Sequence, residues 1–465
     1  MRTVMPVIVG LVGVVTIASG AVAKPVEHSR ADAEALDLAK KAIALRSVQG
    51  PGNQAPQVAE LFKSALIAGG YSDADVTIAP LGDTAYLIAR WKGQDPKLKP
   101  LVISGHMDVV EAKPADWQRD PFTPIVENGM LYGRGASDMK LDDALAVATL
   151  IQLKRQGYKP RRDIVLALSG DEETTMKTTE KLAEALSNAE MVLNVDGTSG
   201  ELNATGKPEY FTWSGAEKTY ADFELTVTSP GGHSSRPYDP NAITELSAAL
   251  VRIGKYKFKP ELSELTRAYF TSAARYERPE IGAAMRAFAA DPTDAKAIAT
   301  LTADPSTIGK IGTTCVATMI NGGHALNALP QRATANINCR VFPGHPRQQI
   351  MAELQQVAAD PAVQFKDVSE GSVATDASPL RPDVVGAIRK ALQASYPGVP
   401  EFPTMSAGAS DSMWFRNRHI PSYGVSPLFI KESDRFSHGL NERIPTDDIP
   451  PAVTYLLTLF TELSK

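Results

Sequence analysis

The sequence predicts an α/β fold in which a mostly parallel sheet is flanked by helices and a smaller α+β domain is inserted. Short, mostly apolar runs at 101–103, 164–168 and 191–195 are typical of strands buried on both faces. Helical patterns separate these runs, as in strand-helix-strand units. After about residue 213 the pattern changes to alternating strands, and helix-strand-helix spacing returns after about 373. We therefore expect one domain to be inserted within another.

The first residues have the layout of a secretory signal. Arg2 precedes an apolar stretch that ends in Ala21-Val22-Ala23, which predicts a signal peptide at 1–23 cleaved after Ala23. The alternative is an uncleaved anchor, which Pro6 and the small residues of the run disfavour. No later apolar run approaches the roughly 20 residues that span a bilayer. We expect a periplasmic or secreted protein with no membrane contact beyond its signal.

Composition excludes one class of partner. The chain has 465 residues, 22% charged residues and a net charge of −5, and it contains no basic run. These values are ordinary for a globular protein of two or three domains and argue against a nucleic-acid partner.

The first part of the predicted catalytic domain, 24–213, alternates helices and strands. Its second part, 374–465, contributes a helix, a strand and a closing helix. The helical pattern of the first part runs over 32–66, with a second helix around 58–68. The other expected helices of both parts are 142–156, 182–189, 379–396 and 450–463, and the expected strands are 85–89, 101–103, 164–168, 191–195 and 421–425.

The predicted inserted domain, 214–373, contains two strand-helix-strand units. Strands are expected at 221–227, around Cys315 and Cys339, and at 363–368, with helices at 241–253 and 347–358. Two such units predict a small ferredoxin-like α+β domain with an open sheet face. Between the units, residues 255–310 show helical spacing and no strand signal, so we expect a helical insertion, whose purpose the pattern does not indicate.

Cys315 and Cys339 are the two cysteines of the chain, and they lie symmetrically about Asn327 on two alternating runs. If these runs pair as a hairpin, the cysteines face each other. Export favours a disulfide, whereas the demanding cross-strand geometry leaves two buried thiols as the alternative.

A histidine and several acids directly follow the apolar strands. Parallel sheets place their ligand sites at the carboxyl ends of the strands, and His106 and Asp108 point the same way on an extended backbone, so that the carboxylate can orient the imidazole. Each acid taken alone is typical of a solvated loop residue. Together, however, their carboxylates repel one another unless cations neutralise the charge. The pattern predicts a metal site formed by residues that include His106, Asp138, Glu172, Glu173 and Asp196.

Several motifs then resemble those of one enzyme family in order and approximate spacing. They are GHMDVV at 105–110, the W-x3-PF-x-P stretch at 117–124, GRGASD at 133–138, GDEE at 170–173, DG at 196–197 and the late His438. They resemble the co-catalytic di-zinc peptidases, a family that includes carboxypeptidase G, aminoacylase, succinyl-diaminopimelate desuccinylase, carnosinase-type dipeptidases and carboxypeptidase S. The resemblance covers essentially the whole mature chain.

The resemblance implies two Zn²⁺ ions per subunit. Asp138 would bridge them, His106 and Asp196 would complete one site, and Glu173 and His438 the other. Asp108 would hold His106, and Glu172 would be the general base acting on a metal-bridging water. Co²⁺ or Mn²⁺ would suit the same ligands.

The resemblance also implies residues that contact the substrate. Gly232-His233 resembles a turn whose histidine reaches the partner subunit's active site and stabilises the oxyanion, so the inserted domain would be a dimerisation (lid) domain of a homodimer. Asn327 and Arg340 resemble positions that contact the substrate's carbonyl and carboxylate, and an arginine fork suits a carboxylate. The alternatives are a loop asparagine and a solvent-facing strand arginine. The positions in the substrate loop are Gly408 and Ser410.

The expected function is hydrolysis of amide bonds in dipeptides, short peptides or N-acyl amino acids. Asp stands at 196 where carboxypeptidase-like members often have Glu, which favours a dipeptidase or aminopeptidase. Carboxypeptidase and N-acyl-amino-acid amidohydrolase activities are the alternatives. A di-zinc aminopeptidase without an inserted domain is disfavoured by residues 214–373, and a non-catalytic peptide-binding protein is disfavoured by Glu172 and the five ligand positions.

Overall fold

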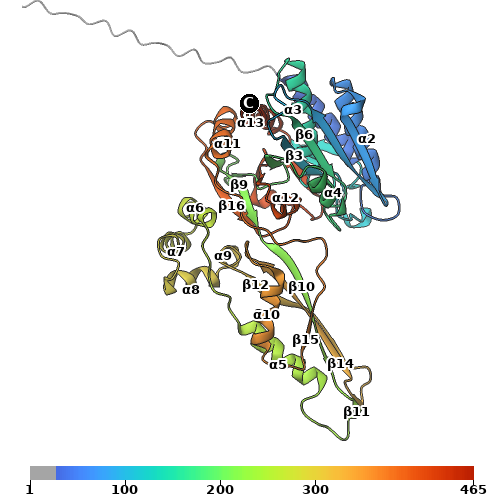
Figure 1. Cartoon of the computed structure of the whole chain (residues 1–465), viewed down its shortest axis with the longest axis vertical. Helices are drawn as coiled ribbons and strands as arrows, with labels where there is room; N and C mark the ends of the chain where they lie inside the picture. Colours follow the sequence, from blue (N-terminus) through green and yellow to red (C-terminus); the bar gives the residue numbers. More distant parts are fainter. Residues whose placement is uncertain (1–27) are drawn as a thin grey trace, which may run out of the picture.

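The computed structural model describes residues 28–465, so the predicted signal at 1–23 lies outside the described residues. Two unequal bodies are visible in Figure 1. The larger contains the first helices and the C-terminal helix, and the smaller extends away from it as an elongated arm. In the part of the chain that the structure describes, no helix is long and apolar enough to cross a membrane.

A ten-stranded sheet forms the centre of the larger body, in the order β1-β2-β6-β3-β7-β17-β9-β8-β18, with β16 beside β9. Its middle strands, from β6 to β17, are parallel, whereas β1, β2 and β9 add antiparallel pairs. The strands are β1 Val76–Leu81, β2 Thr84–Trp91, β3 Leu101–His106, β6 Ile164–Ser169, β7 Met191–Asn194, β8 Gly200–Leu202, β9 Pro208–Glu217, β16 Glu401–Ser406, β17 Ser422–Gly424 and β18 Phe429–Lys431. This sheet confirms the predicted α/β fold.

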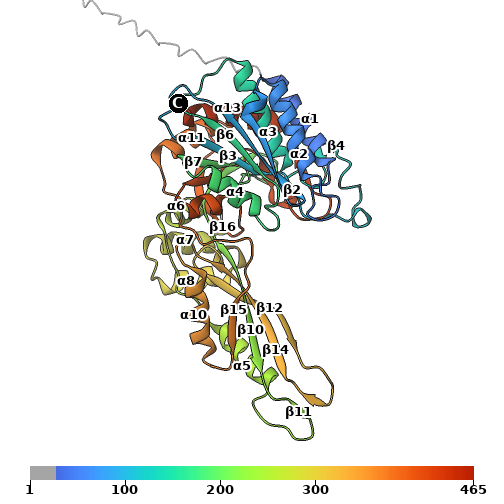
Figure 2. The same cartoon turned by 45° about the vertical axis from the view of Figure 1, so that its right-hand side comes forward.

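Helices cover both faces of this sheet (Figure 2), because successive side chains of a strand point to opposite sides. Leu101 and Ile103 of β3 join a core with α1, α2, α3, α11 and α13, and Val102 joins another with α4 and α12. The helices are α1 Ser29–Ile43, α2 Ala55–Ala68, α3 Lys140–Arg155, α4 Lys177–Ala185, α11 Pro382–Ser395, α12 Ser412–Asn417 and α13 Ile449–Leu463. Smaller elements are η1 Asp73–Asp75, η2 Pro114–Asp116, η3 Glu432–Asp434 and the sheet of β4 Ile125–Glu127, β5 Met130–Tyr132 and β19 Arg443–Pro445.

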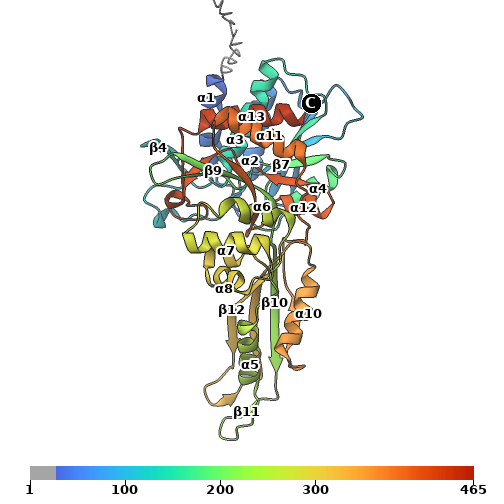
Figure 3. The ribbon, with the colours of Figure 1, turned by 90° about the vertical axis from the view of Figure 1, so that its left-hand side faces the viewer.

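The smaller body is built on an antiparallel sheet in the order β12-β14-β10-β15. Strand β10 follows β9 almost without interruption and so carries the chain from one body to the other (Figure 3). The elements are β10 Thr219–Thr228, β12 Thr314–Gly322, β14 Arg332–Val341, β15 Gln364–Asp367, α5 Ala242–Lys255 and α10 Arg347–Ala358. Both helices pack on one face of the sheet. The domain limits 24–213, 214–373 and 374–465 remain predictions. The predicted boundary between residues 213 and 214 falls inside β9.

Two further features belong to this arm. A two-stranded ladder of β11 Gly232–His233 and β13 Ala328–Leu329 forms its far tip (Figure 1). Cys315 and Cys339 are directly paired in the β12–β14 register, and they form a disulfide. The alternative of two buried thiols does not hold in this structure.

Helices also occupy the segment between α5 and β12. They are α6 Glu264–Ala273, α7 Pro279–Ala290, α8 Ala295–Ala303 and α9 Pro305–Ile308. Phe270, Met285, Phe288 and Leu301 give the segment a small core of its own, which also includes Phe402 of β16. The segment therefore packs against the larger body.

Candidate metal centre and active site

Two histidines and a carboxylate between them form the centre of the candidate site. His106 Nε2 lies 3.2 Å from Asp138 Oδ1, and His438 Nε2 lies 3.2 Å from Asp138 Oδ2. Glu173 Oε1 is 3.0 Å from His438 Nε2, and Asp196 Oδ2 is 3.9 Å from His106 Nε2. The structure thus brings the five predicted ligand positions together, with one oxygen of Asp138 facing each histidine.

Strand order explains why these residues meet. His106 ends β3, and its partner in the register is Ser169 of the parallel strand β6, which Glu172 and Glu173 follow within a few residues. Asp196 follows β7, the neighbour of β3 on its other side. Carboxyl ends of adjacent parallel strands lie at the same sheet edge, so the side chains after them converge.

Burial and charge make this cluster unfavourable without a cation. Burial raises the pKa of Glu173, Asp196 and Glu172, whose carboxylates also repel one another. Hydrogen bonds to Asp138 and Glu173 raise the pKa of His438 to about 10. The cluster therefore retains protons that a metal ion would displace.

The donor set fits a metal ion. Ligand atoms of His106, Asp138 and Glu173 all lie within 4.8 Å of one another, and imidazole nitrogen with carboxylate oxygen suits Zn²⁺, Co²⁺ or Mn²⁺.

Asp108 contacts His106 in a way that the sequence does not predict. His106 Nδ1 donates to the backbone carbonyl of Asp108 at 3.0 Å, and the carboxylate lies 3.6 Å from the same nitrogen. The carboxylate instead accepts hydrogen bonds from the backbone N–H groups of Glu172 and Glu173, both at 3.0 Å. Asp108 therefore orients the imidazole chiefly through its backbone and holds the Glu172-Glu173 turn through its side chain.

Glu442 is a site residue that the sequence analysis missed. It is fully buried, and its carboxylate accepts hydrogen bonds from the backbone N–H groups of Gly135, Ser137 and Asp138 and from Arg134 Nη1. Glu442 thereby fixes the backbone that carries Asp138. A lone acid four residues after His438 has no sequence pattern that would have indicated this role.

Asp142 and Asp143, in the first turn of α3, also lie at the site, although the sequence motifs did not indicate them as site residues. Asp142 accepts a hydrogen bond from Ser426 Oγ at 2.8 Å and lines, with Asp138 and Asp196, a hollow of about 290 Å³. The buried carboxylate of Asp143 has no hydrogen-bond partner among residues 28–465, and a Cβ at Gly105 would lie 2.3 Å from its Oδ1. Only a glycine at 105 leaves space for this carboxylate behind the site.

Three of the predicted substrate residues lie where the two bodies join. Arg340 stacks on Tyr220 and donates from Nη1 to the carbonyl of Ala407 at 3.4 Å. The neighbouring loop holds Gly408, whose N–H donates to Ser406 Oγ, and Ser410, whose hydroxyl donates to Glu217 Oε2 at 2.8 Å. Arg340 and this loop therefore lie next to each other where the two bodies join.

His233 and Asn327 are not brought to the metal cluster of their own chain. His233 is exposed on β11, with Nδ1 bonded to Ser235, and the N–H of Ser234 donates to the carbonyl of Asn327 at 3.0 Å. Both lie at the far tip of the arm, away from β3 and β6 (Figures 1 and 2). Neither residue therefore contributes to the metal cluster of its own chain in this structure.

Comparison with known proteins gives a family match. The model of the peptidase family M20/M25/M40 matches residues 102–462. The N-fatty-acyl-amino acid synthase/hydrolase PM20D1 of Xenopus tropicalis is 26% identical over 86% of this chain and 77% of its own length. The human protein of the same name is 27% identical over 79% of this chain and 75% of its length.

Solved structures agree on the fold. The M20 metallo-carboxypeptidase Sso-CP2 of Sulfolobus solfataricus aligns with a TM-score of 0.71 at 20% identity, covering 93% of this chain and 99% of that one. Human carnosine dipeptidase 1 aligns with a TM-score of 0.61 at 16% identity, covering 94% and 97%.

Proposed function

Because the chain belongs to the peptidase family M20/M25/M40, and is thus a hydrolase of peptide-type amide bonds, we propose that it uses two metal ions to cleave dipeptides, short peptides or N-acyl amino acids. The observation that carries the proposal is the position of Asp138, with one carboxylate oxygen 3.2 Å from His106 and the other 3.2 Å from His438. A carboxylate that faces two histidines in this way is suited to bridge two ions.

In this proposal two Zn²⁺ ions are held by Asp138 in common, by His106 and Asp196 on one side, and by Glu173 and His438 on the other. When bound, such ions polarise the scissile carbonyl and lower the pKa of water, which supplies a nucleophile at neutral pH. Cobalt or manganese would suit the same donors.

Glu172 is the proposed general base. Its side chain is largely buried beside the cluster, and its backbone N–H is anchored on Asp108 Oδ1 at 3.0 Å. Burial raises the pKa of Glu172 well above its ordinary value, which suits a carboxylate that takes a proton from water and then donates it to the leaving amine.

The proposal includes two alternative substrate classes, and a different observation favours each. Asp196 in place of Glu favours a dipeptidase or aminopeptidase, which requires a free amine. The names of the PM20D1 and carboxypeptidase S relatives, together with Arg340 beside the Gly408 loop, favour a carboxypeptidase or N-acyl-amino-acid hydrolase. This second class requires a free carboxylate.

Hydrolysis of a substrate panel tests this proposal. The metal-loaded protein is given free dipeptides, the same dipeptides N-acetylated, and the same dipeptides amidated at the carboxylate. Loss of activity on acetylation alone supports the dipeptidase or aminopeptidase. Loss on amidation alone supports the carboxypeptidase or N-acyl-amino-acid hydrolase, and absence of hydrolysis of all three contradicts the proposed function.

We also propose that the protein acts as a homodimer. Strand β12 is an edge of the arm sheet and exposes Val316, Met319 and Ile320, each 59–63% accessible. An exposed apolar edge strand is suited to pair with a second copy. His233 and Asn327 of one chain would then serve the active site of the other.

Subunit complementation tests the dimer. The variants H233A and E172Q should each be nearly inactive alone, because one lacks the histidine supplied to the partner and the other lacks the base. Mixing them under conditions of subunit exchange should restore activity, since each mixed dimer contains one intact site. If mixing restores nothing while exchange is demonstrated, His233 does not act across an interface.

Export to the periplasm or the medium remains a proposal. It is supported by the signal pattern at 1–23 and by the Cys315–Cys339 disulfide. Sequencing the N-terminus of the protein recovered from the source cells tests it. A mature chain that begins near residue 24 supports export, and one that retains residues 1–23 contradicts cleavage.

A further inference from the structure

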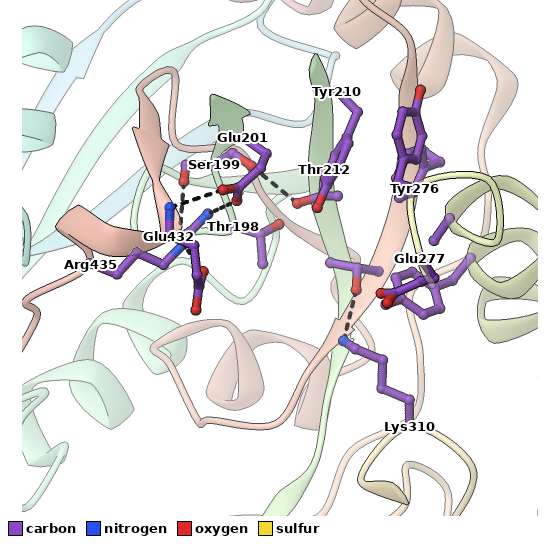
Figure 4. Close-up of a pocket in the computed structure, with 14 residues that line it drawn as sticks. Thr198, Ser199, Glu201, Tyr210, Thr212, Tyr276, Glu277, Lys310, Glu432 and Arg435 are labelled. Atoms are coloured by element: carbon purple, nitrogen blue, oxygen red, sulfur yellow. Dashed lines mark hydrogen bonds and ion pairs between the residues drawn. The ribbon is translucent and has the colours of Figure 1, made fainter. Parts of the chain in front are cut away.

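A chamber of about 230 Å³ lies between the helical segment and the large sheet (Figure 4). Its lining, which we call the aromatic chamber, includes Ser199, Tyr210, Tyr269, Tyr276, Phe402 and Arg435. Tyr269 belongs to α6 and Tyr276 follows it, whereas Tyr210 and Phe402 belong to β9 and β16. The segment whose purpose the sequence did not indicate therefore forms one wall of a cavity on the larger body.

The aromatic chamber adjoins the candidate metal centre. Ser199 and Arg435 line both this chamber and the hollow that contains Asp138 and Asp196. Along the chain, Ser199 lies three residues after Asp196. The chamber and the hollow of the metal centre are therefore neighbours that share these two lining residues.

Aromatic rings form one part of a lining that also contains hydroxyl and charged groups. The ring centroids of Tyr210 and Tyr276 are 4.5 Å apart, and those of Tyr210 and Phe402 are 5.2 Å apart. Tyr276 and Phe402 are stacked at 6.0 Å. The tyrosines are half-buried, so they offer ring surface to a further ring, which offset or edge-to-face packing stabilises.

The charged groups of the chamber largely compensate one another. Arg435 forms ion pairs with Glu201 at 2.7 Å and with Glu432 at 2.9 Å. Lys310 donates hydrogen bonds to Thr404 and to a backbone carbonyl of β16, and Glu277 lies near it in the same wall (Figure 4). A charged ligand would have to disrupt these contacts, whereas a neutral ring would not.

We propose that the aromatic chamber is the subsite for an aromatic side chain of the substrate, and that the helical segment confers this preference. The inference rests on the proposed function, and it names the substrates as dipeptides or N-acyl amino acids with Phe, Tyr or Trp next to the scissile bond. The volume of the chamber equals roughly eight waters at about 30 Å³ each, which suits one ring.

Kinetics with paired peptides test the inference. The zinc-loaded protein is given Phe-Ala, Ala-Phe, Lys-Ala, Ala-Lys and Ala-Ala. We expect one of the two aromatic peptides to have a kcat/KM about 10- to 100-fold above that of Ala-Ala, because a buried aromatic ring replaces a methyl group. Equal rates for aromatic and alanyl peptides, or a preference for a lysyl peptide, would overturn it.

Variants locate the preference within the molecule. Y276A should reduce the ratio of aromatic to alanyl kcat/KM to within about threefold, and Y276F should keep the ratio because the ring remains. Y256A is the matched control, since Tyr256 precedes the same segment but bonds to Glu353 outside the chamber. An equal ratio in the native protein and Y276A would contradict the assignment.

A binding measurement separates this inference from the proposed function. Calorimetry with N-acetyl-L-phenylalaninamide and N-acetyl-L-alaninamide needs no hydrolysis. If no free, N-acetylated or amidated peptide is cleaved, the proposed function fails, yet tighter binding of the aromatic probe to the native protein than to Y276A still supports the chamber. Equal binding of both probes, or no effect of Y276A, overturns the chamber even when peptides are cleaved.

Discussion

Glu442 offers a sharp test of how the Asp138 backbone is held, through the variant E442Q. In the native protein Oε1 accepts from the N–H of Ser137 at 2.8 Å and of Asp138 at 3.1 Å, and Oε2 accepts from Gly135 N–H at 3.1 Å and Arg134 Nη1 at 2.6 Å. Each oxygen therefore faces donors only. Glutamine replaces one oxygen with an NH₂ group, which sets donor against donor and leaves Arg134 without its charged partner.

The expected cost follows from burial. Arg134 and Glu442 are 3% and 0% exposed, and removing one member of such a buried pair costs about 3–5 kcal/mol. The free energy of unfolding of E442Q in the metal-free state should fall by that amount. Because the displaced backbone carries Asp138, metal affinity should also fall, by about 10- to 100-fold, as it does when groups that orient metal ligands are lost.

Urea denaturation and metal titration of native protein and E442Q measure both effects. The matched control is E34Q, since Glu34 also pairs with an arginine, Arg155, at 2.9 Å but is about 30% exposed. That substitution should change the free energy of unfolding by less than about 1 kcal/mol. If E442Q loses less than about 1 kcal/mol and binds metal like the native protein, Glu442 does not hold this backbone.

Three further predictions concern other parts of the chain. Burial, with neighbouring cations, lowers the pKa of Lys218 to about 7, so between pH 7 and 10.5 the unfolded chain binds a proton that the folded chain lacks. The free energy of unfolding should therefore rise across this pH range, by at most about 1.4 kcal/mol per pH unit. Urea denaturation of K218M at pH 7, 8 and 9 should show a smaller rise with pH than the native protein does. Reduction of the Cys315–Cys339 disulfide, whose cysteines are 24 residues apart, should destabilise the protein by about 3 kcal/mol in denaturation with and without reductant; an unchanged midpoint would contradict this. D108A should lower kcat at saturating zinc by about 10- to 100-fold, since the turn that carries the proposed base loses its acceptor, and unchanged kcat would show that the turn holds without it.

Buried strands were the most predictable part of the fold. The runs at 101–103 and 164–168 lie within β3 and β6, and the run at 191–195 covers β7 and the residue after it, because a strand covered by helices on both faces is mostly apolar without alternation. Strand β9, Pro208–Glu217, was not predicted as a strand, since its burial changes from half-exposed to fully buried along its length. No single periodicity describes such a strand.

Three of the proposed metal ligands, His106, Glu173 and Asp196, could be predicted from topology because they end or follow the neighbouring parallel strands β3, β6 and β7. Asp138 follows β5 of the small sheet and His438 lies beyond η3, so strand order alone does not bring these two to the site. Glu442 and the aromatic chamber were not predictable, because their contacts join segments far apart in the chain. Glu442 bonds to residues about 305 positions earlier, and Phe402 meets the ring of Tyr276 only in the folded protein. Such contacts leave no local pattern of spacing or polarity in a sequence.

The kcat of E172Q, measured together with its bound zinc, decides between a catalytic Glu172 and a structural one. Glutamine keeps the size of the side chain but cannot take a proton from water, so kcat should fall by about 10²- to 10⁴-fold while two zinc ions remain bound per subunit. Activity within a few fold of the native protein, at full metal content, would contradict the proposed role of Glu172 as the general base.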